Sequence, residues 1–180
     1  VLIDLEGHGR EEIFPELDVS RTVGWFTTIY PVAFTVNGTW EAQLKHAKNQ
    51  YRGVPHNGFG YGLLAQENQP HAEVSFNYLG QFDQALNQTS IFAQSQLSQG
   101  NERDPNGQRA YLFDVSGFIA GEKLHLNWAY SGELYQQKTV QRLLDTFAQA
   151  VQDIIDYAQE QERPFRTPTD FPLTKIGRAH

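Results

Sequence analysis

The chain has 180 residues, 39% of them hydrophobic, which is enough for one sizeable core and indicates a single domain or one lobe of a larger one. The absence of cysteine excludes disulfides, thiolate metal ligands and cysteine nucleophiles, and it fits a cytoplasmic protein. The net charge of −7, with scattered Lys and Arg, disfavours nucleic acid as a partner, and no apolar run approaches the roughly 18 residues that a membrane span needs.

The first predicted element is a strand over residues 1–5, which delivers Glu6 to a loop at its C-terminal end. Open α/β sheets commonly place their chemistry at that edge. Because the chain starts inside a strand and without Met, we expect it to be part of a longer protein. Residues 28–36 form a second β-rich run, in which Pro31 favours an edge strand or a bulge.

A helix is predicted to begin after Thr39, a suitable N-cap, and to end near Gly53, with an ion pair between Glu41 and Lys45 one turn apart. A glycine-rich turn over 53–62 leads into a short segment. We then expect a polar loop over 63–72 and a strand over 73–79.

The second half begins with a stretch rich in Gln, Asn and Ser, residues 84–107, which is expected to be loop or irregular edge. A hairpin is predicted from residues 111–120 and 123–130, with its turn at Gly121 and Glu122. Residues 137–161 carry one apolar stripe at helical spacing, which predicts a helix that covers the sheet.

The segment Glu6-Gly7-His8-Gly9-Arg10 puts a carboxylate, an imidazole and a guanidinium within five positions. Its glycines allow positive φ and close approach of a ligand to the backbone. Glu6 suits a general base, because a partly apolar cleft raises the pKa of a carboxylate. From these residues alone, a structural role for Glu6, in a tight turn or paired with Arg10, is the slightly favoured alternative.

Four strings resemble consecutive signature motifs of the epimerization domains of nonribosomal peptide synthetases. They are Glu-Gly-His-Gly-Arg at 6–10, Asp-Val-Ser-Arg-Thr-Val-Gly-Trp-Phe-Thr at 18–27, Gly-Phe-Gly-Tyr-Gly at 58–62 and Phe-Asn-Tyr-Leu-Gly-Gln at 76–81. Their order also matches, and the similarity runs over essentially the whole chain.

The resemblance implies an α/β fold, namely one lobe of a two-lobe fold of the chloramphenicol-acetyltransferase type with a mixed sheet covered by helices. It also implies inversion at Cα of an aminoacyl or peptidyl residue, thioesterified to the phosphopantetheine of a peptidyl carrier protein. A second acid/base group in this family is the histidine of a His-His-x-x-x-Asp-Gly motif in the N-terminal lobe. That motif does not occur in these 180 residues.

We therefore expect residues 1–163 to be the C-terminal lobe of such a domain, and residues 164–180 to be a proline-containing linker toward the next module. The expected partners are the carrier protein, the N-terminal lobe and the adjacent synthetase modules. The isolated chain is expected to be inactive.

The catalytic glutamate of the family falls on Glu6. His8 is a candidate for shuttling a proton or orienting Glu6, with an ordinary loop hydrogen bond as the equal alternative. Arg10 is a candidate for stabilising an enolate, although an ion pair with an acid such as Asp18 is favoured. Asn77 and Tyr78 match family active-site positions; as neighbours on a strand, they should point to opposite faces.

Trp25 and Phe26 suit the wall of a substrate tunnel, but a place in the core is the favoured interpretation for Trp25. Tyr61, among three glycines, is a further candidate for substrate binding, with a plain turn as the alternative. The histidines show no metal-ligand spacing, so no metal is expected.

Two other functions stay open: a condensation domain that forms an amide between two carrier-bound residues, and a catalytically silent module that docks carrier proteins. The strings at 6–10 and 18–27 favour epimerization over condensation.

Overall fold

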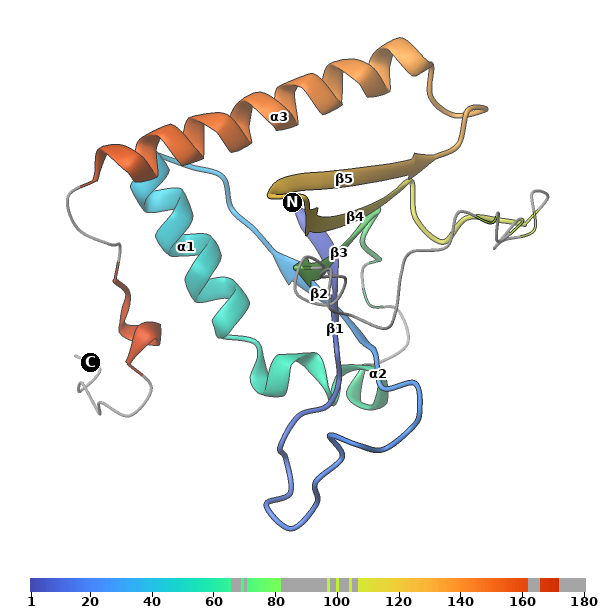
Figure 1. The fold of residues 1–180 in the computed structure, drawn as a ribbon, viewed down its shortest axis with the longest axis vertical. Helices are drawn as coiled ribbons and strands as arrows, with labels where there is room; N and C mark the ends of the chain where they lie inside the picture. Colours follow the sequence, from blue (N-terminus) through green and yellow to red (C-terminus); the bar gives the residue numbers. More distant parts are fainter. Residues whose placement is uncertain are drawn as a thin grey trace.

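The computed structural model describes residues 1–65, 69, 71–81, 97, 100, 104, 107–161 and 166–171. The stretch expected to be irregular, 84–107, lies almost entirely outside the described residues. Within them, five strands form one mixed sheet in the order β2-β1-β3-β4-β5 (Figure 1). The strands are β1 (Leu2–Gly7), β2 (Thr28–Ala33), β3 (Val74–Gln81), β4 (Phe113–Ala120) and β5 (Lys123–Tyr130).

The middle of the sheet is parallel and its edges are antiparallel. β3 runs parallel to both β1 and β4, whereas β2 and β5 pair antiparallel with β1 and β4. β2 is an edge strand, as Pro31 predicted, since a residue without an N–H is tolerated there. The β4–β5 hairpin turns at Gly121 and Glu122, also as predicted, and both residues have positive φ.

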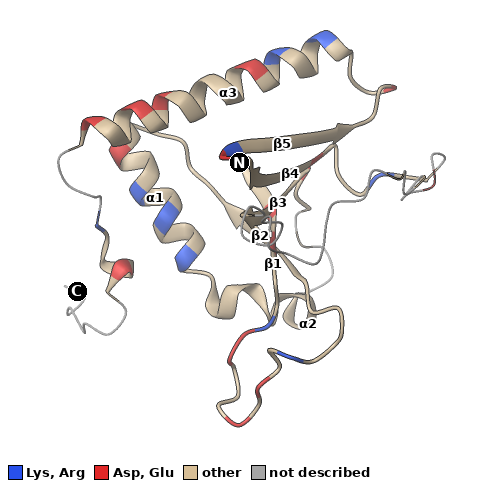
Figure 2. Cartoon of the chain, in the orientation of Figure 1, with Lys and Arg blue, Asp and Glu red and all other residues tan. Residues whose placement is uncertain are grey.

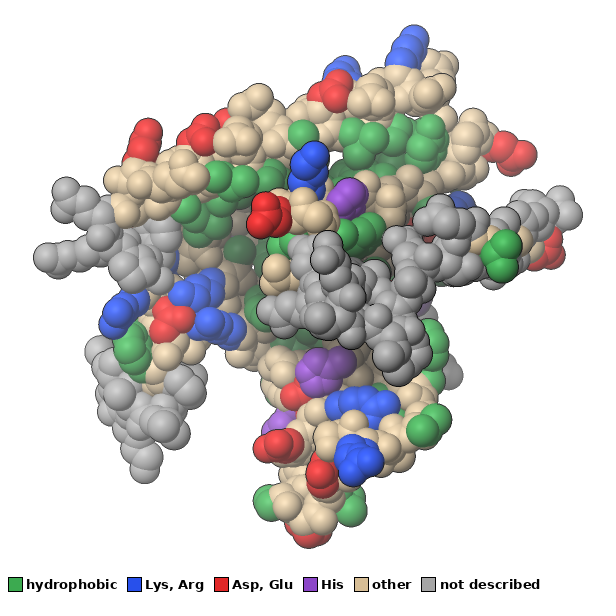
Figure 3. Space-filling model, in the orientation of Figure 1, with side chains coloured by type: hydrophobic (Ala, Val, Ile, Leu, Met, Phe, Trp, Pro, Cys, Tyr) green, Lys and Arg blue, Asp and Glu red, His purple; other side chains and the backbone are tan. Residues whose placement is uncertain are grey.

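One face of the sheet is apolar and packs against the long helix α3 (Gln137–Glu160). Val140 of α3 is buried against Phe113 and Val115 of β4, and Trp128 of β5 meets Phe147 edge to face. Hydrophobic side chains fill the seam between α3 and the sheet (Figure 3). The predicted helix that covers the sheet is therefore confirmed, and the core lies between these two layers.

Helix α1 (Trp40–Arg52) begins and ends where the sequence predicts. The Thr39 hydroxyl accepts a hydrogen bond from the Ala42 amide, Gly53 follows the last turn, and Lys45 pairs with Glu41. After it come a 3-10 turn, η1 (Pro55–Gly58), and a one-turn helix, α2 (Tyr61–Leu64). The polar loop expected from residue 63 thus starts later, because Leu63 and Leu64 complete α2.

Near the C-terminus, the proline-containing segment forms a three-residue 3-10 turn, η2 (Pro168–Asp170), against α1. Lys48 of α1 donates to an Asp170 carboxylate oxygen at 2.6 Å, and Arg52 donates to the other oxygen. Basic positions of α1 face the acidic position of η2 in Figure 2. Residues 166–171 are therefore held on the lobe. None of the described helices has the length and apolar character of a membrane span.

Candidate active site

Glu6 lies near the C-terminal end of β1 and contacts Asn77 on the neighbouring strand. The parallel register pairs Asp4 with Ser75 and Leu5 with Phe76, so Asn77 comes next to Glu6. The Asn77 amide Nδ2 donates to Glu6 Oε2 at 2.6 Å. Both side chains are half-buried. A pair 71 residues apart in sequence is thus formed by strand pairing alone.

The same face of the sheet carries further polar side chains. Asp4, two residues before Glu6 on β1, accepts a hydrogen bond from the Tyr111 hydroxyl at 2.8 Å. Burial raises the pKa of Tyr111 well above its ordinary value, and the hydrogen bond to Asp4 adds to the shift. The phenol therefore stays protonated and remains a donor to Asp4.

A second polar cluster continues this face onto β4. Ser75 donates to Asp114 Oδ1 at 2.8 Å, and Arg109 donates both to Asp114 and to the Ala129 carbonyl. The charge of Asp114 is therefore balanced by a guanidinium. The sequence analysis missed these residues; alternation of Asp4 with Glu6 in the first strand was the signal available, since residues two apart share a face.

Tyr78 lies on the opposite side of β3 from Asn77. It follows Val74 and Phe76 at strand spacing, and these two side chains pack against the core. Tyr78 itself is 50% exposed, near the end of the strand. The prediction that Asn77 and Tyr78 point to opposite faces is consistent with this pattern, and it is Asn77 that reaches Glu6.

His8 makes local contacts in the loop after β1. Its Nδ1 accepts a hydrogen bond from the Arg10 amide at 3.0 Å, and its Nε2 lies 3.6 Å from Glu11 Oε1. The side chain is 71% exposed. The first contact fixes the imidazole tautomer of neutral His8, with the proton on Nε2.

Arg10 closes the loop that runs from β1 to β2. Its guanidinium donates to the Val19 carbonyl at 2.6 Å and to the Gly24 carbonyl at 3.4 Å, and it lies 4.2 Å from the centre of the Phe26 ring. The expected ion pair with Asp18 is wrong. Asp18 instead accepts hydrogen bonds from Ser20, which lower the pKa of its carboxyl.

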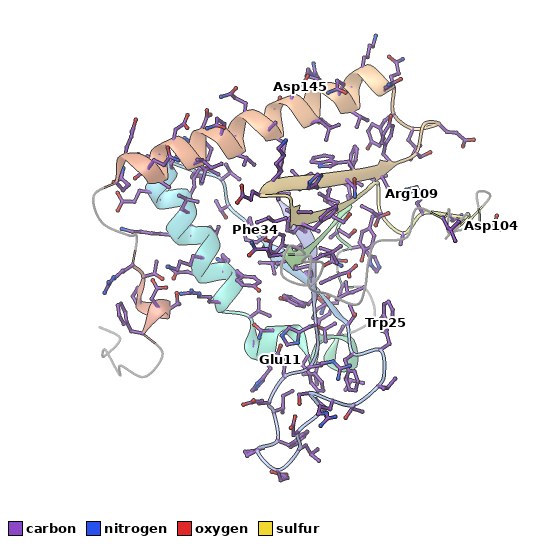
Figure 4. All side chains as sticks on the ribbon, viewed as in Figure 1. Glu11, Trp25, Phe34, Asp104, Arg109 and Asp145 are labelled. Atoms are coloured by element: carbon purple, nitrogen blue, oxygen red, sulfur yellow. The ribbon has the colours of Figure 1, made fainter. Side chains whose placement is uncertain are left out.

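Trp25 projects from this loop into solvent, 91% exposed, so the favoured interpretation as a core residue is wrong (Figure 4). Its neighbour Phe26 turns inward and stacks under Arg10. Loop closure over Arg10 separates the two aromatic residues, which a sequence of adjacent apolar letters does not reveal.

Tyr61 lines a cavity of about 530 Å³ at the edge strand β2. Tyr30 and Val32 of β2 also line it, and their partners in β1 are Leu5 and Ile3. By strand alternation this is the face opposite to Glu6. The structure therefore does not bring Tyr61 together with the Glu6–Asn77 pair. Among the described residues, no cluster of three or more His, Asp or Glu side chains could hold a metal ion.

Comparison with known proteins gives a family match over most of the chain. A family model described as the condensation domain matches residues 1–176. A linear gramicidin synthase protein of Brevibacillus parabrevis is 42% identical over 98% of this chain, which is 2% of that protein. Gramicidin S synthase 1 of Brevibacillus brevis is 33% identical over 98% of this chain and 18% of that protein.

A solved structure is also similar: the epimerization domain from the third module of tyrocidine synthetase B. It is 34% identical with a TM-score of 0.81, and the match covers 89% of this chain and 38% of that one. The chain thus spans a minor part of each relative. The predicted fold class, an α/β lobe with a mixed sheet covered by helices, is confirmed by this match.

Proposed function

The chain belongs to the condensation-domain family, and we propose that it is the C-terminal lobe of an epimerization domain in a nonribosomal peptide synthetase. The reaction is inversion of Cα in an aminoacyl or peptidyl residue held as a thioester on the phosphopantetheine of a peptidyl carrier protein. Residues 1–163 form the lobe in this proposal, and residues 164–180 lead toward the next module.

The observation that carries the proposal is the hydrogen bond from Asn77 Nδ2 to Glu6 Oε2, at 2.6 Å. Removal of an α-proton needs a base that is held within reach of the carbon, because proton transfer depends on geometry before it depends on pKa. Asn77 donates a hydrogen bond but has no proton to lose, so it can fix the carboxylate without competing for the substrate proton. Glu6 is the base in this proposal.

Inversion needs a second group on the other side of the substrate. One group removes the proton from one face, and another returns a proton to the opposite face of the planar enolate. The similarity to epimerization domains indicates a histidine of the other lobe for this role. The enolate oxygen also needs hydrogen-bond donors or positive charge close by.

The remaining predicted residues have supporting roles. Arg10 holds the loop after β1 closed through two carbonyls and the Phe26 ring. The exposed Trp25 is proposed to line the substrate path where the two lobes meet. His8 and Tyr78 remain predicted substrate contacts, and Tyr61 a predicted substrate-binding residue.

The test uses a complete two-lobe domain that contains this chain, together with a carrier protein loaded with an L-aminoacyl phosphopantetheine. After incubation the thioester is cleaved and the enantiomers are separated by chiral chromatography. We expect D-residues to accumulate, and the same mixture to form from a D-loaded carrier. Retention of the L-configuration with a panel of aminoacyl and dipeptidyl carriers would refute the proposal.

Condensation is the second candidate, because the matching family model is described by that activity. The same assay distinguishes the two when a second, acceptor-loaded carrier is added. An amide-linked dipeptidyl carrier with unchanged configuration supports condensation, whereas inversion without a new amide bond supports epimerization.

A further inference from the structure

The polar face that carries Glu6 also holds a second carboxylate on the same strand, Asp4. Side chains two apart in a strand share a face and lie about 7 Å apart. Glu6 is hydrogen-bonded by Asn77, and Asp4 by the Tyr111 hydroxyl. In the part of the chain that the structure describes, no Lys or Arg lies within ion-pair distance of Asp4.

We propose that Asp4, oriented by Tyr111, is a positioning residue for the base: its negative charge makes the Glu6 carboxylate a stronger proton acceptor. This inference rests on the proposed function, because it concerns the strength of Glu6 in proton removal. The physical reason is that a nearby negative charge stabilises the protonated form of a carboxyl group. Tyr111 is a neutral donor, so it can orient Asp4 while leaving its negative charge uncancelled.

The other groups that face Glu6 do not supply the same effect. From β2 the paired residue is Ile29, and from β3 the facing residues are the neutral Ser75 and Asn77. From the loop comes His8, which is exposed beside Glu11.

From β4 comes one further charge, Asp114, and it is balanced by Arg109. Asp4 is therefore the unbalanced charge nearest to Glu6 along its own strand. The charges of Asp4, Asp114 and Glu6 all contribute to the raised pKa of Tyr111, which places these groups within electrostatic range of one phenol.

The experiment measures the rate of inversion against pH in a complete domain, for wild type and for Asp4→Asn. Asparagine keeps the size of the side chain and can still accept from Tyr111. The acidic limb of the profile reports protonation of the base, so we expect it to move down by about one pH unit in Asp4→Asn. The plateau rate should fall roughly two- to fivefold, because a weaker base removes the proton more slowly.

Asp145→Asn is the matched control. Asp145 is an exposed residue of α3, where it accepts a hydrogen bond from Gln141, and its change removes the same charge far from Glu6 (Figure 4). We expect its profile to coincide with that of wild type. If Asp4→Asn does not fold, Asp4→Ser takes its place, since a hydroxyl can accept from Tyr111 without a charge.

Tyr111→Phe tests the orienting contact. It should move the acidic limb in the same direction by a smaller amount, because Asp4 keeps its charge but loses its partner. A profile for the Asp4 variants that coincides with the Asp145→Asn profile would overturn the inference. In contrast, absence of inversion by wild type in this assay would refute the proposed function itself.

Discussion

Asn77 and Glu6 are joined by a hydrogen bond of 2.6 Å between the side-chain amide and the carboxylate, across two parallel strands. The pairing register of β1 with β3 fixes this contact, and no local sequence feature does. It ties the first and the last of the four sequence motifs into one site. Variants of Asn77 therefore test whether Glu6 must be held in one orientation.

Asn77→Ala removes the donor, so we expect inversion to slow by about 10- to 100-fold, the effect of losing one hydrogen bond to a charged group. Asn127→Ala is the control. Asn127 is exposed, and cross-strand pairing through Ser116 places it on the same face as Asn77. Steady-state rates for the two variants should differ by at least about tenfold, and equal rates would remove Asn77 from the site.

Arg10→Ala should open the loop between β1 and β2, because the guanidinium links Val19 and Gly24 to the Phe26 ring. Hydrogen–deuterium exchange over residues 11–25 is expected to rise severalfold, with little change in β3 to β5. Arg21→Ala, an exposed arginine of the same loop, serves as control and should leave exchange unchanged. Unaltered exchange in Arg10→Ala would show that the loop is held by other contacts.

Gly9→Ala should be strongly destabilising. A Cβ at this position would lie 1.6 Å from the Phe26 carbonyl oxygen, and φ is +65°. Gly121 has a similar φ of +58° but open space around it, so Gly121→Ala isolates the backbone strain, about 1 kcal/mol. We expect Gly9→Ala to lower the free energy of unfolding by about 2–4 kcal/mol in denaturant titrations. Equal losses for the two variants would contradict the close approach.

Asp170 should release the C-terminal segment when it is protonated or replaced. Its hydrogen bond from Lys48, together with those from the Thr167 amide and Arg52, holds the pKa of the carboxyl below its ordinary value. A lowered folded-state pKa means that this stabilisation is complete above the unfolded-state pKa of about 3.9. It is lost as the pH falls below that value.

Asp170→Asn should therefore expose residues 166–171 to a protease at neutral pH, whereas wild type should stay protected until the pH falls well below about 4. Asp156→Asn is the matched control, since Asp156 lies exposed on α3 and accepts a hydrogen bond from Gln152 there. Cleavage sites are read by mass spectrometry. Protection of the segment in Asp170→Asn would show that the ion pairs do not hold it.

The elements of the fold were largely predictable, because their signals are local. The apolar stripe of α3, the Thr39 cap of α1 and the Gly121 turn of the hairpin are each properties of a few neighbouring residues. The strand order was a different matter. That β1 lies between β2 and β3 follows from long-range packing, which no short pattern encodes.

The site was predictable in part. The motifs pointed to Glu6 and Asn77, and strand alternation separated Asn77 from Tyr78. The roles of Asp4 and Tyr111 were missed, because their contact joins residues 107 positions apart. Trp25 was misjudged since the closure of its loop by Arg10 decides which aromatic residue turns inward.

The central claim is that Glu6 removes the α-proton. Its most direct test is uptake of solvent deuterium at Cα of a carrier-bound residue, measured by mass spectrometry in D₂O, for a complete domain with Glu6→Gln. Glu12→Gln, an exposed glutamate in the loop that follows Glu6, is the control. We expect exchange to fall at least about 100-fold in Glu6→Gln and to stay at the wild-type rate in Glu12→Gln. Wild-type exchange and inversion in a folded Glu6→Gln domain would contradict the account.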